Sequence, residues 1–269
     1  MDSRVQPMDE TLIQLSPSSA SNFKSCPLLF KYRNIDRLDE PISTRQAGGS
    51  LVHAVLEKLF AQEAPARTTE RAGELLEALW RELREEPEWR PTELDTEDEV
   101  GWLESNRKLL SNYFLLEDPS TLDAARLEWW VEYDLDAVQL RGVIDRVEEK
   151  DDGSWILTDY KTGKVPGAAR EQSASLGLRF YALVCWRAYG IIPEELRLVY
   201  LADPAVLTWR PTERTLLAFE RQMQALAKAV RRAADTGDWR PRPSPFCMSC
   251  AFQDRCPAWN ESVRGSQAV

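Results

Sequence analysis

The sequence contains a single histidine, no apolar run long enough to cross a membrane, and no excess of basic residues. Its 34 Lys and Arg residues are outnumbered by 44 Asp and Glu residues, giving a formal net charge of −10. This charge disfavours a broad polyanion-binding surface, although a local basic groove is compatible with it. The N-terminus also lacks the basic and then apolar pattern of a secretory signal, which predicts a cytoplasmic protein without membrane association.

The five cysteines do not form an even set, which in a cytoplasmic chain argues against a disulfide framework. Cys185 lies in the apolar helical pattern YALVCWRAYG and is expected to be a buried small hydrophobic side chain. Cys247 and Cys250 form a C-x2-C pair, Cys256 follows after five residues, and Cys26 lies far upstream. Four such thiolates hold Zn²⁺ or a 4Fe–4S cluster, and the absence of a second C-x2-C pair favours iron–sulfur.

The pattern along the chain predicts a single α/β domain over residues 1–269 with a real hydrophobic core. Residues 1–15 are expected to form a loose tail, followed by a helix that begins near Ser18 and Ser19 and a second that begins at Gly48. A helical insertion with an acidic face is expected over 66–118, and a cysteine-bearing segment over 240–260. Strands are expected at 127–135, 138–149, 154–161, 196–202 and 206–210, and further helices at about 171–189 and 213–234.

The second and third of these strands flank the turn sequence KDDGS, in which a glycine follows two aspartates. A two-residue loop would place Asp145 opposite Tyr160 and put Asp159 on the other face of the sheet. A three-residue loop with Gly153 in the left-handed conformation would place Asp145 directly opposite Asp159. Lys161 would then share their face, because alternate strand residues point the same way. We predict the three-residue loop, because it gathers two carboxylates and an ammonium group at one point.

Two adjacent carboxylates repel each other unless a cation lies between them, and their oxygens are ligands suited to Mg²⁺ or Mn²⁺. Such a metal polarises a phosphoryl oxygen and activates water, while a lysine stabilises charge on the phosphate. The alternative is structural: Asp145 pairs with Arg146 and Asp159 with Lys161 as surface ion pairs. His53 likewise is either a metal-binding or proton-handling histidine or one packed under the sheet.

These motifs, in this order, resemble the iron–sulfur branch of the RecB-like PD-(D/E)XK nucleases, which includes the AddB C-terminal nuclease and the CRISPR-associated exonucleases. The resemblance covers nearly the whole chain. LSPSSASNFKSCPLLFKYR resembles the family's S-x-S…C-P-x-x-F-x-Y segment, GGSLVHAVLEKLF its G-x-x-x-H helix, GVIDRVEE its G-x-I-D-R strand, LTDYKTG its (D/E)-x-K strand, and FCMSCAFQDRCP its C-terminal cluster motif.

The resemblance implies a mixed sheet of about four strands flanked by helices and a role for each matched residue. Metal ligands would be His53, Asp145, Asp159 and the Tyr160 carbonyl, with Lys161 as the catalytic lysine. Cys26, Cys247, Cys250 and Cys256 would bind a structural 4Fe–4S cluster. The chain would be a Mg²⁺- or Mn²⁺-dependent exonuclease acting on single-stranded DNA or DNA ends in repair or recombination.

One position departs from the family pattern: Gly177 stands where the Q-x-x-x-Y helix carries its glutamine, although the tyrosine is present as Tyr181. Arg179 is the better substitute for the missing amide, ahead of Gln172, because its cation can meet a phosphate. Glu128, where the family often has a glutamate, is expected to support the metal ligands indirectly.

Two other functions are compatible with the same residues. One is a catalytically weak or inactive DNA-binding protein, consistent with Gly177, and the other is an adaptor with four cysteines on zinc. The candidates for a confined basic groove are Lys24, Lys31, Arg33, Arg170 and Arg179. Trp129, Trp130 and Trp155 are expected in the core, whereas Trp239 and Trp259 are candidates for base stacking. A phosphate-loop motif is missing, so any helicase partner would be a separate chain.

Overall fold

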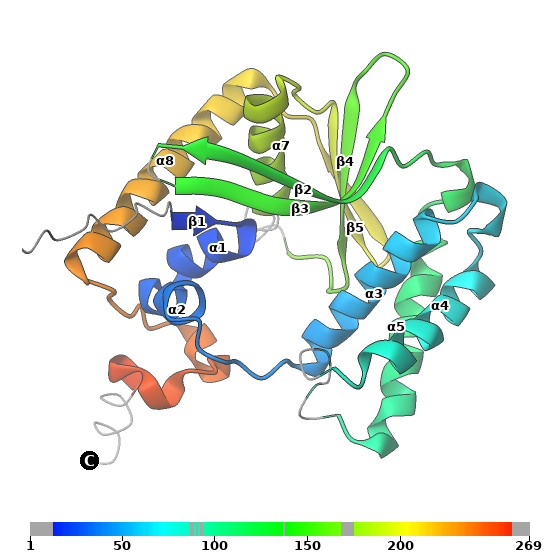
Figure 1. Cartoon of the computed structure of the whole chain (residues 1–269), viewed down its shortest axis with the longest axis horizontal. Helices are drawn as coiled ribbons and strands as arrows, with labels where there is room; N and C mark the ends of the chain where they lie inside the picture. The colour runs from blue at the N-terminus through cyan, green and yellow to red at the C-terminus, as the bar shows by residue number, and fades with distance from the viewer. Residues whose placement is uncertain are drawn as a thin grey trace, which may run out of the picture. The chain divides into compact units, whose positions relative to one another are not determined.

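The computed structural model describes residues 13–259, except 87, 88, 90, 92, 93, 137 and 168–174 (Figure 1). The chain divides into two compact units. The first contains the described parts of Met1–Arg37, Glu132–Gly142 and Glu220–Val269, and the second contains those of Leu38–Val131 and Val143–Phe219. The single domain expected over 1–269 remains a prediction.

The first unit contains both the N-terminal cysteine of the four-cysteine set and its three C-terminal members. Its regular elements are β1 (Ile13–Leu15), α1 (Pro17–Ser25), α2 (Pro27–Phe30), the π-helical turn η1 (Lys31–Ile35), most of α8 (Glu213–Thr236), and the short helices η5 (Pro245–Ser249) and η6 (Gln253–Arg255). Aromatic contacts join Phe23, Phe30 and Trp239, with the last two rings stacked at 5.9 Å between centroids. Trp239 is therefore a packing residue in this unit.

One expectation for this unit is wrong, and the first helix begins one residue before its predicted start. The tail expected over 1–15 includes β1, which pairs in parallel with the first residues of β3 (Val138–Glu149), from Ile13 opposite Val138 to Leu15 opposite Leu140. So short a strand exists only because a distant segment supplies its hydrogen-bond partners. The first helix begins before Ser18, because the Ser16 side chain and Ser19 form a capping box around Pro17 at the start of α1.

The second unit contains a mixed sheet, as expected. Its strands are the first part of β2 (Arg126–Leu135), the second part of β3, β4 (Trp155–Lys161), β5 (Glu195–Tyr200) and β6 (Ala205–Trp209). The β3–β4 pair is antiparallel, β4–β5 parallel and β5–β6 antiparallel. All five predicted strands are confirmed, with ends shifted by a residue or two.

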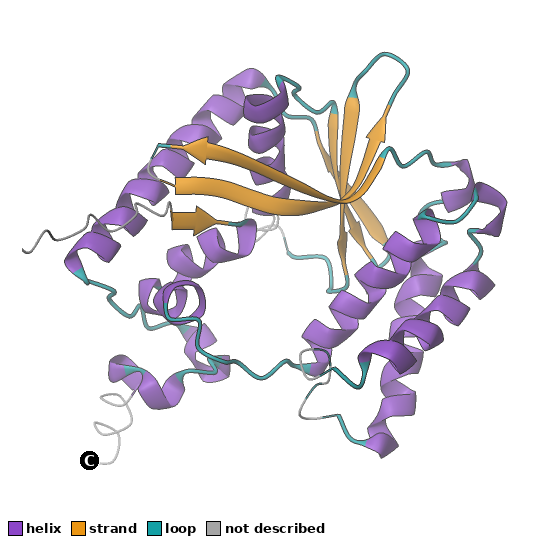
Figure 2. Ribbon diagram, in the orientation of Figure 1, coloured by secondary structure: helices purple, strands orange, loops and turns teal. Residues whose placement is uncertain are grey.

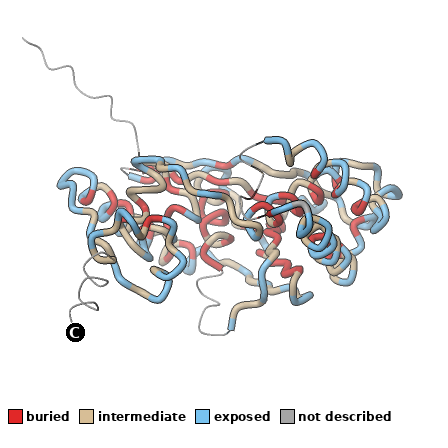
Figure 3. The backbone as a smooth tube through the Cα atoms, turned by 90° about the horizontal axis from the view of Figure 1, so that it is seen from below, coloured by how far each residue is buried: buried red, intermediate tan, exposed pale blue. Residues whose placement is uncertain are grey.

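Helices cover both faces of the central strands (Figure 2). A cluster of buried side chains joins α3 (Thr44–Phe60), α4 (Thr69–Leu83) and α5 (Thr96–Tyr113) to Tyr160, Val199 and Leu201 of the sheet. Helix α7 (Leu176–Tyr189) packs against β4 and β5. The first six residues of β4 are consequently buried, as expected of a strand covered on both faces. Figure 3 shows how buried and exposed stretches of the backbone, in red and pale blue, alternate along the chain. No helix in the described part of the chain is long and apolar enough to cross a membrane.

Helix α3 begins four residues before Gly48, so the predicted start is wrong. Ser43 caps it, with Gln46 completing a capping box. The glycines lie inside the helix, where they permit close approach of other elements. The segment 66–118 is helical over α4 and α5, but its being an insertion remains a prediction. Of the three tryptophans expected in the core, Trp155 is buried, whereas Trp130 is half exposed, which corrects that expectation.

The hairpin between β3 and β4 has the predicted three-residue loop. The Lys150 N–H donates to Ser154 O at 2.9 Å, and the Gly153 N–H donates to Lys150 O at 2.8 Å. Gly153 has φ of +78°, the left-handed conformation that glycine adopts without steric cost. The register pairs Glu149 with Trp155 and Arg146 with Thr158. One step further along the strands, it places Asp145 opposite Asp159.

Candidate active site

Asp145 and Asp159 lie side by side on β3 and β4 and are almost fully buried, at 9% and 6% exposure. The Tyr160 N–H donates to Asp145 Oδ2 at 2.7 Å, which fixes the Asp145 carboxylate against the neighbouring strand. Both carboxylates thus lie on one face of the sheet, as the predicted register requires.

His53 reaches the same point from α3. Its Nδ1 lies 3.4 Å from Asp145 Oδ2, and its Nε2 lies 3.1 Å from the Tyr160 carbonyl oxygen. Both ring nitrogens therefore face acceptors, an arrangement that favours the doubly protonated imidazolium while no metal is bound. The interpretation of His53 as a packed histidine beneath the sheet is not supported by these contacts.

Glu128 of β2 is the member of the site that the sequence indicated most weakly. One ligand atom each from His53, Glu128 and Asp145 lie within 4.8 Å of one another. Glu128 has φ of +41°, which is rare for a residue other than glycine and concentrates at functional sites. It belongs directly to the carboxylate cluster, where we had expected it to act only through the ligands.

Burial and crowding shift the proton equilibria of these groups. Burial favours neutral His53, but the hydrogen bond and charge of Asp145, with Asp159 and Glu128, raise its pKa to about 9. Burial, then the Asp145 charge, raises the pKa of Glu128 to about 7. Burial also raises the pKa of Asp159, with Lys161 opposing it. The site therefore has more negative charge than its cations offset.

Lys161 is the cation nearest to Asp159, and its ammonium contacts Asp159 Oδ2. Burial would lower the pKa of Lys161, but Asp159 and Asp145 hold it above its ordinary value. The side chain remains 39% exposed, so the charged ammonium is accessible from solvent. This is the predicted grouping of two carboxylates and one ammonium.

The opposite face of the sheet holds a fully buried guanidinium, that of Arg146. It donates to Glu117 through both terminal nitrogens, at 2.8 and 2.9 Å, and to Glu148 at 2.9 Å. It also donates to the Tyr160 hydroxyl at 2.8 Å and lies 4.8 Å from the Phe60 ring centre. Arg146 therefore does not pair with Asp145, contrary to the structural alternative for these strands.

Tyr160 connects the two faces. Its N–H binds Asp145, its carbonyl oxygen binds His53, and its hydroxyl accepts from Arg146. The ring is held by the buried ion network while the backbone contacts the acidic site. Arg146 thus positions the Tyr160 backbone without touching the reacting groups.

The proposed substrate residues differ in their surroundings. Tyr181 is buried, and burial followed by the charges of Asp159, Asp145 and Glu128 raises its pKa. The Arg179 guanidinium lies 4.7 Å from the Phe219 ring centre, and burial lowers its pKa. Its role in binding substrate remains a prediction. Arg170 and Gln172 lie outside the described residues.

A family model described as the PD-(D/E)XK nuclease superfamily matches residues 14–257. The chain belongs to this superfamily. Among solved structures, the chain is similar to a candidate exonuclease from Eubacterium rectale, at 11% identity, over 93% of this chain and 92% of that one, with a TM-score of 0.58. SSO0001 aligns over 91% and 87% at 15% identity, with a TM-score of 0.42. Among curated proteins, none matches this sequence.

Divalent metals serve PD-(D/E)XK nucleases, and the residues of this site fit one. Carboxylates and one imidazole are a donor set for Mg²⁺ or Mn²⁺. The buried Asp159 Oδ2 already faces one cation, the Lys161 ammonium, and no other described group donates to it. An acceptor in this position is available to a cation. His53, Glu128 and Asp145, with Asp159 beside them, are the residues that would hold the metal.

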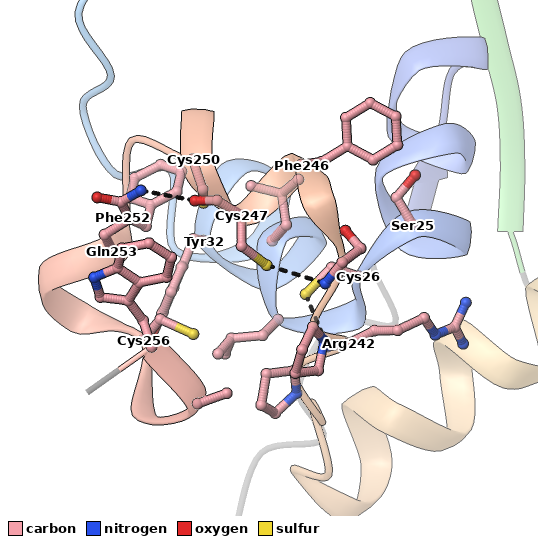
Figure 4. A pocket seen from close by; sticks show the side chains of 17 residues that line it. Ser25, Cys26, Tyr32, Arg242, Phe246, Cys247, Cys250, Phe252, Gln253 and Cys256 are labelled. Carbon is pink, nitrogen blue, oxygen red and sulfur yellow. Dashed lines mark hydrogen bonds between the residues drawn. The ribbon is translucent and has the colours of Figure 1, made fainter. Parts of the chain in front are cut away.

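A second candidate site lies within the first unit, where Cys26, Cys247, Cys250 and Cys256 all line one cavity of about 310 Å³ (Figure 4). The Arg242 N–H donates to Cys26 Sγ and the Ser244 N–H to Cys247 Sγ, both at 3.4 Å. The Tyr32 hydroxyl donates to Arg255 O at 2.9 Å, which ties η1 to the C-terminal segment. The structure thus brings together the four cysteines that the sequence grouped. Cys185 is buried elsewhere, in α7, where burial raises its pKa to about 12.

The lone histidine makes the electrostatics of the acidic site directly measurable. In metal-free protein, NMR titration of the imidazole should give a pKa near 9 for His53. Because this value exceeds the ordinary 6.5, the stability that the charged form provides is complete below pH 6.5 and is lost as pH rises through about 9. Asp145→Asn should lower the pKa markedly, because it removes the largest interaction that opposes burial. An unchanged titration in this variant would contradict the assignment.

The buried ion network should dominate local stability. Arg146→Met leaves Glu117 and Glu148 without their buried partner and should lower the free energy of unfolding by about 3–5 kcal/mol in urea denaturation. The matched control is Lys150→Met, which removes an exposed pair with Glu194 and should cost less than about 1 kcal/mol. Equal effects of the two variants would show that the network contributes nothing beyond a surface ion pair.

Proposed function

We propose that this protein is a Mg²⁺- or Mn²⁺-dependent deoxyribonuclease, specifically an exonuclease that acts on single-stranded DNA or DNA ends. The observation that carries the proposal is the β3–β4 register. It sets Asp145 opposite Asp159 with Lys161 on the same face, in a chain of a nuclease superfamily. His53 and the Tyr160 carbonyl lie at the same point and are the remaining proposed ligands.

The residues divide the work of hydrolysis between them. A divalent metal, when bound, polarises a phosphoryl oxygen and lowers the pKa of a coordinated water. Asp145, Asp159 and His53 would hold this metal, and Glu128 adds a further carboxylate beside them. Lys161 is a charged donor that stabilises developing negative charge on the phosphate or orients the attacking water. Tyr181, buried close to the carboxylates, contacts the substrate side of the site.

We propose further that the four cysteines bind a structural 4Fe–4S cluster, placing the chain in the iron–sulfur, RecB-like branch with AddB. A zinc ion with sulfurs at about 2.3 Å draws those sulfurs to within roughly 4 Å of one another. Among the described residues, no three cysteine sulfurs lie within 4.8 Å of one another, although all four face one cavity. This spacing supports a group larger than a single ion. The proposed setting is cytoplasmic DNA repair or recombination, with any helicase as a separate protein.

The nuclease proposal is tested by digesting end-labelled linear and covalently closed circular single-stranded DNA with anaerobically purified protein. We expect Mg²⁺- or Mn²⁺-dependent loss of the linear DNA alone. Asp159→Ala and Lys161→Ala should each reduce the rate by at least about 10²–10³-fold, because each removes charge stabilisation from the reaction. Lys164→Ala, a lysine three residues beyond Lys161, is the control that should retain activity. No cleavage by the intact holoprotein would favour a binding role instead.

The cluster proposal is tested by iron, sulfide and zinc analysis of anaerobically purified protein. We expect iron and sulfide with broad visible absorbance, and loss of both in Cys256→Ser. Cys185→Ala should keep them, because Cys185 lies apart from the cavity. Stoichiometric zinc without sulfide would instead identify a zinc site and remove the iron–sulfur assignment.

A further inference from the structure

A pocket of about 250 Å³ lies in the second unit next to the acidic site, and neither the acidic residues nor the cysteines form any part of it. Its walls come from the first turns of α3, from α5 and from the end of β4. The lining residues that matter here are Thr44, Arg45, Gly49, Trp102, Asn106 and Thr162.

The pocket adjoins the catalytic residues along two elements. Thr162 directly follows Lys161 at the end of β4, and Gly49 precedes His53 by four residues on α3. One turn of helix advances about 5.4 Å, so Gly49 lies roughly one turn from the proposed histidine ligand. A nucleic acid strand held at the metal would therefore present its next nucleotide here.

Two glycines of α3 create this space. A Cβ on Gly48 would lie 2.6 Å from Asn106 Oδ1, so Gly48 permits α3 and α5 to pack closely. A Cβ on Gly49 would lie 3.2 Å from the Thr162 hydroxyl oxygen, a tight contact that would cover this hydroxyl. Gly49 thus leaves Thr162 open to the pocket, beside the catalytic lysine.

Two of the donors that line the pocket have no partner in the described part of the chain. Neither the exposed Arg45 guanidinium nor the Thr162 hydroxyl makes a hydrogen bond or ion pair there. Arg45 lies one helical turn before Gly49 on α3, which places its positive charge at the pocket. Trp102 closes one side of the pocket, with its indole N–H donated to Thr44 O at 3.0 Å. Free donors beside an aromatic wall match a phosphate joined to a sugar and base.

We propose that this pocket binds the nucleotide adjacent to the scissile phosphate, with Arg45 and Thr162 on its phosphate and Trp102 against its sugar or base. The proposal rests on the nuclease function above, since it assigns a neighbouring subsite of the same strand. Arg45 and Thr162 position the strand, whereas Lys161 acts on the reacting phosphate.

Binding is measured in a Lys161→Ala background, which keeps DNA intact, by fluorescence anisotropy of a short labelled oligothymidylate at several salt concentrations. Arg45→Gln should weaken binding about tenfold and reduce the slope of log K against log salt by about 0.7, because one phosphate contact is lost. Thr162→Val should weaken binding severalfold without changing the slope. The control is Arg81→Gln, which removes the same charge from an exposed position on α4 and should change neither quantity.

Cleavage by the same variants with Lys161 restored should show a higher KM and a nearly unchanged kcat, as should Gly49→Ala, whose methyl group covers Thr162. Circular dichroism and denaturation midpoints establish that each variant is folded. If Arg45→Gln binds with the same affinity and salt slope as Arg81→Gln, the subsite does not exist.

The two proposals fail in different ways. If the intact protein cleaves nothing but the Lys161→Ala protein loses DNA affinity through Arg45→Gln, the nuclease function falls and the nucleotide pocket stands. If cleavage is normal and insensitive to Arg45, Thr162 and Gly49, the nuclease stands and the pocket assignment is overturned. If the protein neither cleaves nor binds DNA, both are overturned.

Discussion

The repulsion between two buried carboxylates is the constraint on which the rest of this structure depends. Asp145 and Asp159 lie on adjacent strands with little solvent to separate their charges. Lys161 and His53 offset part of this charge, and Glu128 adds to it. A fold that keeps such a cluster must hold it rigidly and expose it to a cation. The strand register provides the rigidity, and the partly exposed Lys161 shows that the cluster is not sealed from solvent.

Rigidity comes from the back of the sheet. Arg146 is fully buried and the side chains of Glu117 and Glu148 are only 9% and 14% exposed, so their attraction is little screened, and the guanidinium can satisfy several acceptors at once. The guanidinium of Arg197 on β5 lies 3.5 Å from Glu148 Oε1 and 2.6 Å from Glu195 Oε1. These contacts extend the network across the next strand. The acidic site and the ion network therefore share the same strands and lie on opposite faces of the sheet.

Local chemistry made much of this arrangement predictable from sequence. The turn KDDGS allowed a two-residue or a three-residue loop, and the gathering of two aspartates and a lysine on one face selected the second and with it the register. The four cysteines were grouped correctly because their spacing is local for three of them and their neighbouring prolines are distinctive. The family resemblance added His53, which periodicity alone would have assigned to packing.

The parts that sequence did not predict depend on distant partners. Strand β1 forms by pairing with the start of β3, and no feature of the sequence IQL predicts this pairing. Glu128 enters the site through a left-handed backbone angle that no local pattern of LEWWVEY requires. The glycines of α3 were interpreted as a helix start, whereas their use is the approach of Asn106 and Thr162, residues more than 50 positions away. Such features are set by tertiary contacts, which override local preference.

The contacts of Tyr160 affect how the loss of activity in a variant of this residue would be interpreted. The atoms it offers to the acidic site belong to the main chain, which every amino acid except proline would supply, while its own side chain serves the ion network behind the sheet. A loss of activity on truncating residue 160 would look like the loss of a catalytic group. The cause of the lost activity would instead be structural. Without its side-chain contacts the strand is held less firmly, and the peptide group moves from the position that the site requires.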